Sequence, residues 1–502
     1  MELYKSKFLQ KGITQTLLSG KILLPNKTSN SIYQKRLRSD FYYTKNDAKL
    51  VLTSPLKNVS IKKEFSRGLS SGVIGRKNND MWKEYRAIDS RVIRPVDANE
   101  FFITGSIINV TDVFPKISTE EFKKRAEENF SKIELFNIAF KRINGHLFFI
   151  RKPFKIHLEE IEYTEDEEIE NFLKNKDEMV IPYEAIQEKD DKDVQALISF
   201  KVCQLKKSNK TKITLSINHS ISDGRTVFTI MDYIRRIING ESLEKNEEKL
   251  TNFGGLERFK NLDESFYKSP KIWNEIPYLP LLPKMKPPFN HVSPHIIFDY
   301  KPISKFNREN GITVQAMIMA AASRAARRYN NLSKETPIWI SIPTDLRNSP
   351  YSTEEYKNNK LYCNVGIFYV KVVGQSNLMD DLNHCMTQLN EAKKTNDDVR
   401  QVVSCHTIID SKTLAFIPKG KFPNQDIQTV INCTNIGKVN GTFPLVTTSN
   451  DPHIHIFSIF VYCAKDKLFL VIYRPFNFDK TYIDIIKEEI NKIFIPENIS
   501  KY

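Results

Sequence analysis

Apolar residues recur along the chain with two different periods, and the changes between them predict the secondary structure. Apolar and β-branched residues that alternate with polar ones are typical of strands, and apolar spacing of three to four residues is typical of amphipathic helices. The first pattern predicts strands at 101–110, 136–143, 146–151, 156–163, 198–205, 213–219, 338–343, 365–373, 429–434, 453–463 and 468–473. The second predicts helices at 118–133, 167–176, 224–239, 314–329, 378–393 and 482–494.

Cap and turn residues support several of these boundaries. Ser118, followed three residues later by Glu121, is a capping-box pattern that favours a helix start. Asn144-Gly145 is a turn dipeptide typical of a tight hairpin between two strands. Gly240 closes the helix before it, because glycine readily adopts the left-handed conformation in which helices end.

Helices interspersed with strands occur in two successive stretches, which predicts two α/β (α+β) lobes of similar size. We expect an N-terminal lobe over 86–240 and a C-terminal lobe over 301–502. The stretch 241–300 between them is rich in Pro, Lys and Asn and is interpreted as a long crossover or linker. Residues 1–85 are weakly patterned, which indicates an N-terminal extension.

The excess of basic residues is concentrated in that extension. The 502-residue chain has a net charge of +15, but residues 1–85 hold 17 basic and 6 acidic side chains, which leaves +4 for the remainder. This near-neutral body argues against a nucleic-acid-binding protein. The basic arm is interpreted as a segment that contacts a partner or a membrane surface.

The N-terminal residues leave two compartments open. They show no secretory apolar region. Residues 3–39 contain eight basic and no acidic side chains, a composition that resembles a mitochondrial transit peptide. We expect a cytoplasmic protein, with mitochondria as the alternative. No apolar run reaches the roughly 18 residues that a membrane-spanning helix needs.

Cysteine and histidine spacing predicts neither a disulfide framework nor a metal site. The six cysteines are widely scattered without a C-x-x-C pair, and a chain of this size does not need disulfides to fold. His453 and His455 share one face of a predicted strand but have no obvious third ligand. Gly68-Leu-Ser70-Ser-Gly72 matches the G-x-S-x-G nucleophile elbow, yet it lacks the required strand before and helix after it.

The most informative stretch is Leu215 to Gly224, in which a predicted strand ends at His219 and a helix starts after a short turn. A histidine at a strand tip can face a cleft, and its ordinary pKa, about 6.5, suits a general base near neutral pH. Asp223 can hold the turn by accepting hydrogen bonds. Gly224 leaves the helix start free of a side chain, so a substrate can approach closely.

This stretch resembles the HxxxDG signature of the CoA-dependent acyltransferase superfamily, which includes chloramphenicol acetyltransferase, condensation domains, plant BAHD enzymes and alcohol acetyltransferases. Four further segments resemble family segments in the family's order, so that the resemblance covers about residues 86–495. They are Gly311-Ile-Thr-Val-Gln-Ala-Met-Ile-Met-Ala320, Ser341-Ile-Pro-Thr-Asp345-Leu-Arg347, Tyr362-Cys-Asn364-Val-Gly366 and Asn432-Cys-Thr434-Asn435-Ile-Gly437.

The resemblance implies two chloramphenicol-acetyltransferase-like lobes, each a mixed sheet flanked by helices, around an active-site tunnel. His219 would act as the general base, with Asp223 in a structural pair with Arg347. The enzyme would bind no resident cofactor and would move an acyl group from acyl-CoA, as cosubstrate, or from an acyl carrier to an alcohol or amine. Further residues implied at the catalytic centre or in the tunnel are Asn218, Gly224, Asn364, Thr434, Asn435 and Gly437, with Lys438 as a cation for a phosphate-bearing donor.

Two departures from the family patterns bear on the subfamily. Condensation domains usually carry two adjacent histidines, whereas Asn218 precedes His219 here, and the DFGWG segment of the plant enzymes is absent. These departures favour the alcohol acetyltransferase-like branch. The alternative is a non-catalytic protein of the same fold that acts as a ligand-binding or structural subunit. Acceptor, acyl length, ester or amide product, and oligomeric state are left open by the sequence.

Overall fold

The computed structural model describes most of the chain beyond residue 84. The described ranges are 85–104, 106–144, 146–161, 179–181, 186–187, 194–205, 208–244, 255–268, 290–292, 295–408, 430–441, 445–450, 457–475 and 480–499. The chain divides into two compact units, 1–76 and 77–502, and every described residue belongs to the second. The G-x-S-x-G motif, the expected helix 167–176 and both His453 and His455 lie outside the described residues.

Two five-stranded sheets are built mainly from the N-terminal half. The sheet whose strand β10 leads to His219 has the order β16-β2-β10-β9-β5, and the other has the order β1-β4-β3-β8-β7. The strands of the first are β2 (Ser106–Pro115), β5 (Leu158–Ile161), β9 (Ile198–Leu205), β10 (Lys210–Asn218) and β16 (Leu445–Asn450). Those of the second are β1 (Val92–Pro95), β3 (Ile138–Ile143), β4 (His146–Arg151), β7 (Ile186–Gln187) and β8 (Val194–Ala196).

An eight-stranded sheet forms the centre of the C-terminal half. Its order is β14-β13-β15-β17-β18-β11-β6, with β12 also paired to β18, and it mixes parallel and antiparallel pairs. Its strands are β6 (Met179–Ile181), β11 (Asn290–Val292), β12 (Ile296–Asp299), β13 (Ile338–Asp345), β14 (Val365–Val372), β15 (Val430–Val439), β17 (Ser458–Ala464) and β18 (Lys467–Pro475).

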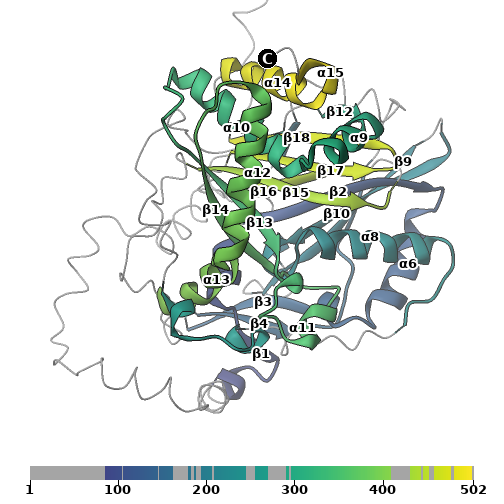
Figure 1. The fold of residues 1–502 in the computed structure, drawn as a ribbon. Helices are drawn as coiled ribbons and strands as arrows, with labels where there is room; N and C mark the ends of the chain where they lie inside the picture. Colours follow the sequence, from purple (N-terminus) through teal and green to yellow (C-terminus); the bar gives the residue numbers. More distant parts are fainter. Residues whose placement is uncertain are drawn as a thin grey trace, which may run out of the picture. The chain divides into compact units, whose positions relative to one another are not determined.

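Helices cover the outer faces of the layered sheets (Figure 1). Within the N-terminal half, α8 (Gly224–Ile238) packs against β2 and β10, and α6 (Thr119–Phe130) packs beside α8. In the C-terminal half, α10 (Val314–Asn330) contacts β13, β15, α12 (Leu378–Thr395) and α14 (Lys480–Phe494). Residues of β17 alternate between the two large cores: Val461 belongs to the C-terminal core, whereas Tyr462 belongs to the N-terminal one. The eight-stranded sheet is therefore buried on both faces where the two halves meet.

The two halves also exchange strands. β16 comes from the C-terminal half, yet it pairs with β2 in the N-terminal sheet. β6 comes from the N-terminal half, yet it pairs with β11 in the eight-stranded sheet. Each half therefore supplies backbone hydrogen bonds that complete a sheet of the other, and the interface between the halves is part of the folded core.

Most of the expected elements are confirmed where the structure describes them. Ser118 accepts a hydrogen bond from the Glu121 backbone N (3.1 Å) at the start of α6, as the capping pattern predicts. The expected strand 101–110 is wrong at its beginning, because residues Ala98–Ile103 form the short helix α5 and the strand starts only at Ser106. Besides α5, the described helices that were not predicted are α9 (Tyr300–Asn310), α11 (Glu354–Asn358), α13 (Asp397–Ile408) and α15 (Pro496–Ile499).

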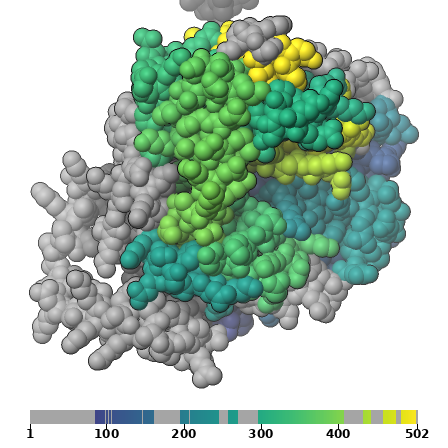
Figure 2. Space-filling model, in the orientation of Figure 1, coloured from purple at the N-terminus to yellow at the C-terminus, as the bar shows by residue number. Residues whose placement is uncertain are grey.

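Part of the expected linker is packed into the fold. Segment 255–268 carries Arg258, which is 1% exposed and donates to the Asp97 carboxylate (3.0 Å) and the Tyr356 hydroxyl (3.3 Å). Phe259 forms an isolated β-bridge with Ser352. In the space-filling view this segment lies on the surface beside α13, with which it makes contact (Figure 2). Segment 255–268 therefore contacts both halves: a buried ion pair joins it to Asp97, and a hydrogen bond to Tyr356 and the bridge to Ser352 join it to the C-terminal half.

Because of the buried His295, just before β12, we expect the free energy of unfolding to depend on pH. The imidazole is buried beside Tyr462, its Nε2 has no hydrogen-bond partner among the described residues, and burial lowers its pKa to about 3. The unfolded chain binds a proton at this histidine below about pH 6.5, whereas the folded chain does not until about pH 3. Stability should therefore fall as the pH falls between these values, by at most about 1.4 kcal/mol per pH unit from this residue.

The variant His295→Leu tests this expectation by urea unfolding at pH 7 and pH 5. We expect the wild type to lose more free energy of unfolding between the two values than the variant does. Equal losses would show that His295 does not contribute to the pH dependence.

Among the described residues, none of the helices is long and apolar enough to cross a bilayer.

Candidate functional site

The turn that carries His219 is held by its own backbone and by Asn218. β10 ends at Asn218, and residues His219–Ile221 form a single 3₁₀ turn. Asn218 is 3% exposed; its amide oxygen accepts from the Ser220 backbone N (3.0 Å) and hydroxyl (2.7 Å), and its amide N donates to the Thr104 carbonyl (2.8 Å). Asn218 thus fixes the turn from beneath, which makes it a positioning residue in this structure.

The imidazole of His219 is half-buried, and its two nitrogens are in different states. Nδ1 lies 2.8 Å from the Ser222 carbonyl oxygen. Because a carbonyl can only accept, Nδ1 must carry the hydrogen, and Nε2 keeps the lone pair of a base. The Cys363 Sγ lies 4.0 Å from Nδ1 and covers that side of the ring. Burial lowers the pKa of His219 below its ordinary value, against the opposing effect of hydrogen bonds and of Asp223, so the neutral form prevails at pH 7.

Asp223 joins the two halves of the molecule at the first turn of α8. Its Oδ1 accepts from the Thr226 backbone N (2.9 Å) and hydroxyl (3.0 Å), which caps the helix. Its Oδ2 accepts from Arg347 Nη1 (2.8 Å) and from the Asn364 backbone N (2.9 Å). Burial alone would raise the pKa of Asp223, but Arg347 and these hydrogen bonds outweigh it and hold the pKa below its ordinary value.

Arg347 follows β13 and is enclosed by acceptors. It is 1% exposed, and Nη1 contacts both the Asp223 and the Asp345 carboxylates, at 2.8 and 2.9 Å. Its other donors go to the backbone carbonyls of Asn359, Leu361 and Tyr362. The structure therefore brings together the pair that the resemblance implies, in an arrangement that leaves Arg347 to support the site from behind.

The segment opposite α8 is also buried and tied across the halves. Tyr362 has a left-handed backbone (φ 67°), and its carbonyl accepts from the Thr226 hydroxyl (2.7 Å) and from Arg347 Nη2 (2.8 Å). Asn364 is 0% exposed, and with its amide oxygen turned toward the guanidinium it accepts from Arg347 Nη2 (2.8 Å) and Nε (2.9 Å). Asn364, expected as a tunnel residue, therefore lies in the buried cluster instead.

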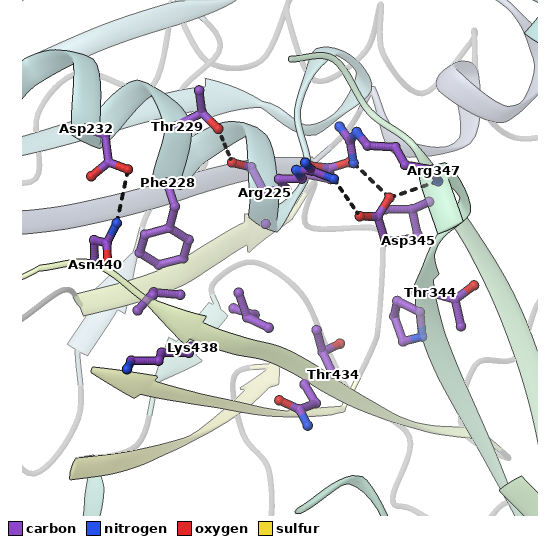
Figure 3. A pocket seen from close by; sticks show the side chains of 17 residues that line it. Arg225, Phe228, Thr229, Asp232, Thr344, Asp345, Arg347, Thr434, Lys438 and Asn440 are labelled. Carbon is purple, nitrogen blue, oxygen red and sulfur yellow. Dashed lines mark hydrogen bonds and ion pairs between the residues drawn. The ribbon is translucent and has the colours of Figure 1, made fainter. Parts of the chain in front are cut away.

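A pocket of about 380 Å³ lies between α8, the end of β13 and β15 (Figure 3). Of the expected site residues, it is lined by Asp223, Gly224, Arg347, Thr434 and Asn435. The described residues that line the pocket do not include four of the expected site residues, namely Asn218, His219, Asn364 and Gly437. The pocket therefore begins at Asp223, four residues after His219. The remaining lining residues are Arg225, Phe228, Thr229, Asp232, Pro343, Thr344, Asp345, Val365, Ile436, Lys438, Val439 and Asn440.

A bulge in β15 shapes the pocket wall at Gly437. Its φ is +84°, which favours glycine, and its backbone N donates to the Asn435 side chain (2.9 Å) where the pairing with β17 shifts. The bulge presents Ile436 to the start of α8, and a Cβ added at Gly224 would lie 3.2 Å from its Cγ2. Gly224 therefore also allows close packing of β15 against α8.

Sequence reasoning did not single out Cys363, Thr226 or Tyr362 as site residues. Cys363 and Tyr362 belong to the segment Tyr362–Gly366 that resembles the family pattern, but only the fold places the Cys363 thiol against the His219 ring. Thr226 offered a weak signal, because a hydroxyl three residues after an N-cap Asp can join the cap.

Among the described residues, no group of three or more His, Cys, Asp or Glu side chains could hold a metal ion.

Gly366, at the start of β14, lies where any side chain would clash with its neighbours. A Cβ built on it would lie 2.6 Å from the Asp398 backbone oxygen and 2.8 Å from Leu346 Cδ2. Because backbone cannot yield as a side chain can, Gly366→Ala should cost about 1–3 kcal/mol of unfolding free energy, measured by urea denaturation. Gly224→Ala meets only a flexible Ile436 side chain and should cost less. The reverse order would contradict this account of the two glycines.

Comparison with solved structures shows which fold this is. The EpoB NRPS cyclization-docking bidomain from Sorangium cellulosum matches with a TM-score of 0.55 and 13% identity, over 80% of this chain and 82% of that one. The epimerization domain from the third module of tyrocidine synthetase B gives 0.54 and 10%, over 82% and 99%. Polyketide synthase associated protein 5 from Mycobacterium tuberculosis gives 0.53 and 13%, over 81% and 99%.

No protein-family model matches the chain, and no curated protein sequence does. The structural similarities nevertheless confirm the expected fold: the chain has the two-lobed, chloramphenicol-acetyltransferase-like architecture of condensation-type domains, with mixed sheets flanked by helices.

Proposed function

We propose that this protein is an acyltransferase that moves an acyl group from a thioester, carried by CoA or by a carrier protein, to an alcohol or an amine, with His219 as general base. The observation that carries the proposal is the state of the imidazole. The ring is neutral, and its Nδ1–H donates a hydrogen bond to the Ser222 carbonyl. The Nε2 atom therefore keeps its lone pair and can accept a proton from the acceptor substrate.

The reaction can be written with this ring alone. Nε2 takes the proton from the acceptor hydroxyl or amine as its oxygen or nitrogen attacks the thioester carbonyl carbon. When the tetrahedral intermediate collapses, the C–S bond breaks and the imidazolium returns the proton to the leaving thiolate. The products are an ester or amide and a free thiol, and His219 regains its neutral form.

The buried cluster behind the ring supports this role. Asp223 ties the end of the His219 turn to Arg347 and to the Asn364 backbone, both from the other half of the molecule. A base held between two lobes by such contacts keeps its position without reorganising during the reaction. The pocket that begins at Asp223 and Gly224 offers space for one of the two substrates.

The test is acceptor-dependent release of thiol from acetyl and longer acyl thioesters, with a panel of alcohols and amines. Wild type and His219→Ala are compared after circular dichroism has shown that both are folded. Release that requires both an acceptor and His219 supports the proposal, and the best acceptor identifies the substrate class. Release that persists in the variant removes His219 as the base. Release without any acceptor indicates a hydrolase instead.

A further inference from the structure

We infer that Cys363 is a positioning residue for the proposed base. Its thiol closes the Nδ1 side of the His219 ring and keeps the imidazole in the orientation that offers Nε2 to a substrate. The inference rests on the proposed function, because a base is positioned only for a reaction. It starts from the contact between Cys363 Sγ and His219 Nδ1, which lie 4.0 Å apart although the two residues are separated by 144 positions in the chain.

The backbone turn that presents the thiol is strained. Tyr362 has a Cβ, yet its φ is 67°, in the left-handed region that such residues rarely adopt. Strain of this kind persists only where the surrounding structure holds it, and it is concentrated at functional sites. The Tyr362 carbonyl accepts from Thr226 and from Arg347, and its buried side chain brings its hydroxyl to 3.4 Å from the Glu134 carboxylate. Contacts from both halves of the molecule therefore maintain this turn.

The residue that follows Cys363 is fixed as well. The Asn364 backbone N donates to Asp223 Oδ2 (2.9 Å), and the Asn364 carbonyl accepts from the Leu346 backbone N (2.8 Å). With Tyr362 held on one side and Asn364 on the other, the thiol cannot withdraw from the ring unless buried hydrogen bonds break. Buried groups left without partners are costly, so the contact between thiol and ring is a fixed feature of the folded protein.

The thiol is neutral and unreactive, so its role lies in its contact with the ring. Cys363 is 6% exposed, and burial, together with the nearby Asp223 carboxylate, raises the pKa of the thiol well above its ordinary value. The thiolate, which is the nucleophilic form of cysteine, is therefore absent at neutral pH. A neutral sulfur is only a weak hydrogen-bond acceptor, so it does not replace the Ser222 carbonyl as the partner of Nδ1–H.

A single hydrogen bond does not fix the orientation of an imidazole. A ring held only at Nδ1 can tilt about that bond, and a water molecule beside Nδ1–H competes with the Ser222 carbonyl for the proton. The Cys363 sulfur fills the space on that side of the ring and opposes both changes. When the bond at Nδ1 is lost, the proton can move to Nε2, and that tautomer has no lone pair where the substrate proton is to be taken. Cys363 therefore protects the tautomer that the proposed reaction needs.

The groups around the ring leave His219 as the residue that titrates between about pH 5 and 8. Those that keep one charge state there are Asp223, with a lowered pKa, and Arg347, Cys363 and Tyr356, with raised pKa values. The helix α5 packs against the turn and carries Glu100, whose pKa burial raises although it is paired with Arg94 (2.7 Å). The adjoining end of β2, residues 106–108, has no titratable side chain. Variants at Cys363 keep all the other groups, so a difference between them and the wild type reports the thiol.

The experiment compares the wild type with two variants of the full chain. Cys363→Ala removes the contact with the ring, and Cys363→Val replaces the sulfur by a methyl group. Three quantities are measured: kcat and KM for thiol release with the best acceptor, the pH midpoint of kcat/KM, and the tautomer of His219. The tautomer is determined by nitrogen NMR of protein with isotopically labelled histidine, in which the signals of His219 are identified by their loss in His219→Asn.

Cys363→Ala should lower kcat by about five- to fiftyfold and change KM by less than about twofold, because a displaced base weakens the transition state and not substrate binding. Its pH midpoint should rise toward about 6.5, since burial lowers the pKa of His219 and water would now reach the ring. The NMR signals should change from the Nδ1–H form to a mixture of both tautomers. Cys363→Val should restore the midpoint, the tautomer and at least about half of kcat, because it refills the space.

Cys385→Ala is the matched control, since it truncates another fully buried cysteine, on α12 in the C-terminal core. It should leave kcat, the pH midpoint and the His219 tautomer unchanged, and urea unfolding shows that both alanine variants are folded. The inference is overturned if the two alanine variants behave alike, or if Cys363→Ala keeps the midpoint and tautomer of the wild type. An acyl group found on Cys363 by mass spectrometry would also overturn it, because the thiol would then be a nucleophile.

The tautomer measurement separates this inference from the proposed function, because it needs no turnover. His219-dependent thiol release, combined with unchanged kinetics and an unchanged tautomer in Cys363→Ala, would leave the acyltransferase standing and remove Cys363 as a positioning residue. A mixed tautomer in Cys363→Ala, without thiol release by the wild type from any donor, would leave the effect of the thiol on the ring standing and remove the proposed reaction.

Discussion

Replacing His219 by asparagine is expected to lower kcat/KM for acyl transfer by a factor of about 10²–10⁴, the usual contribution of a positioned general base. The fold should be preserved, because Ser222 N and the Asn218 side chain hold the turn through contacts that do not use the ring. The measurement is the initial rate of thiol release with the best acceptor. His157→Asn, a half-buried histidine outside the pocket, serves as the matched control and should leave the rate unchanged.

The pH dependence of kcat/KM in the wild type is an independent test of His219 as the general base. The base acts only when neutral, so kcat/KM should fall as the pH falls through the pKa of His219. Because burial lowers that pKa, the fall should occur below pH 6.5, and the rate at pH 6.5 should remain more than half of its plateau. A midpoint above 6.5, or an equally active asparagine variant, would contradict the assigned role.

Replacing Arg347 by methionine is expected to cost about 3–5 kcal/mol of unfolding free energy, because it leaves the buried Asp223 carboxylate without its cation. The change also deprives the Asn359 and Tyr362 carbonyls of a donor. Urea unfolding followed by circular dichroism measures the loss. Arg225→Met is the matched control: that side chain is half-exposed and 3.6 Å from Asp345, so its loss should cost less than about 1 kcal/mol.

The double variant Arg347→Met with Asp223→Ala distinguishes the ion pair from simple loss of packing. If the two charges stabilise each other, the double variant should lose less free energy than the two single variants together. Additive losses would show that each residue acts separately. The pair also has a pH signature: because the pKa of Asp223 is depressed, its stabilisation is present above about pH 4 and is lost as the pH falls toward the lowered value.

Much of the fold was available from the pattern of the sequence. The alternation in 198–205 and 213–219, and the helical spacing in 224–239 and 314–329, correspond to β9, β10, α8 and α10. These elements were predictable because each buries one face or stripe and shows it locally. The sequence pattern did not predict α9, because Pro302 indicates a break in secondary structure. The proline lies in the first turn of the helix, where it is tolerated.

The site itself divides in the same way. The order of His219, Asp223 and Gly224 along one strand, turn and helix is a local property, and the sequence alone placed them together. Only the tertiary structure decided what lies opposite: Cys363 against the imidazole, the Tyr362 carbonyl on Thr226, and Asn364 in the buried cluster rather than in a pocket wall. These partners are more than a hundred residues apart in sequence, and no local pattern records a contact at that separation.

The exchange of β6 and β16 between the halves was likewise decided by the tertiary structure. A strand of three to six residues carries too little pattern to name its partner, and its pairing depends on which sheet edge is free once the larger elements have packed. The sequence by itself determined the type of most elements and the residues of the turn that carries His219. The fold determined how the two halves close around that turn, because closure rests on backbone hydrogen bonds and a buried ion pair that form only between distant segments.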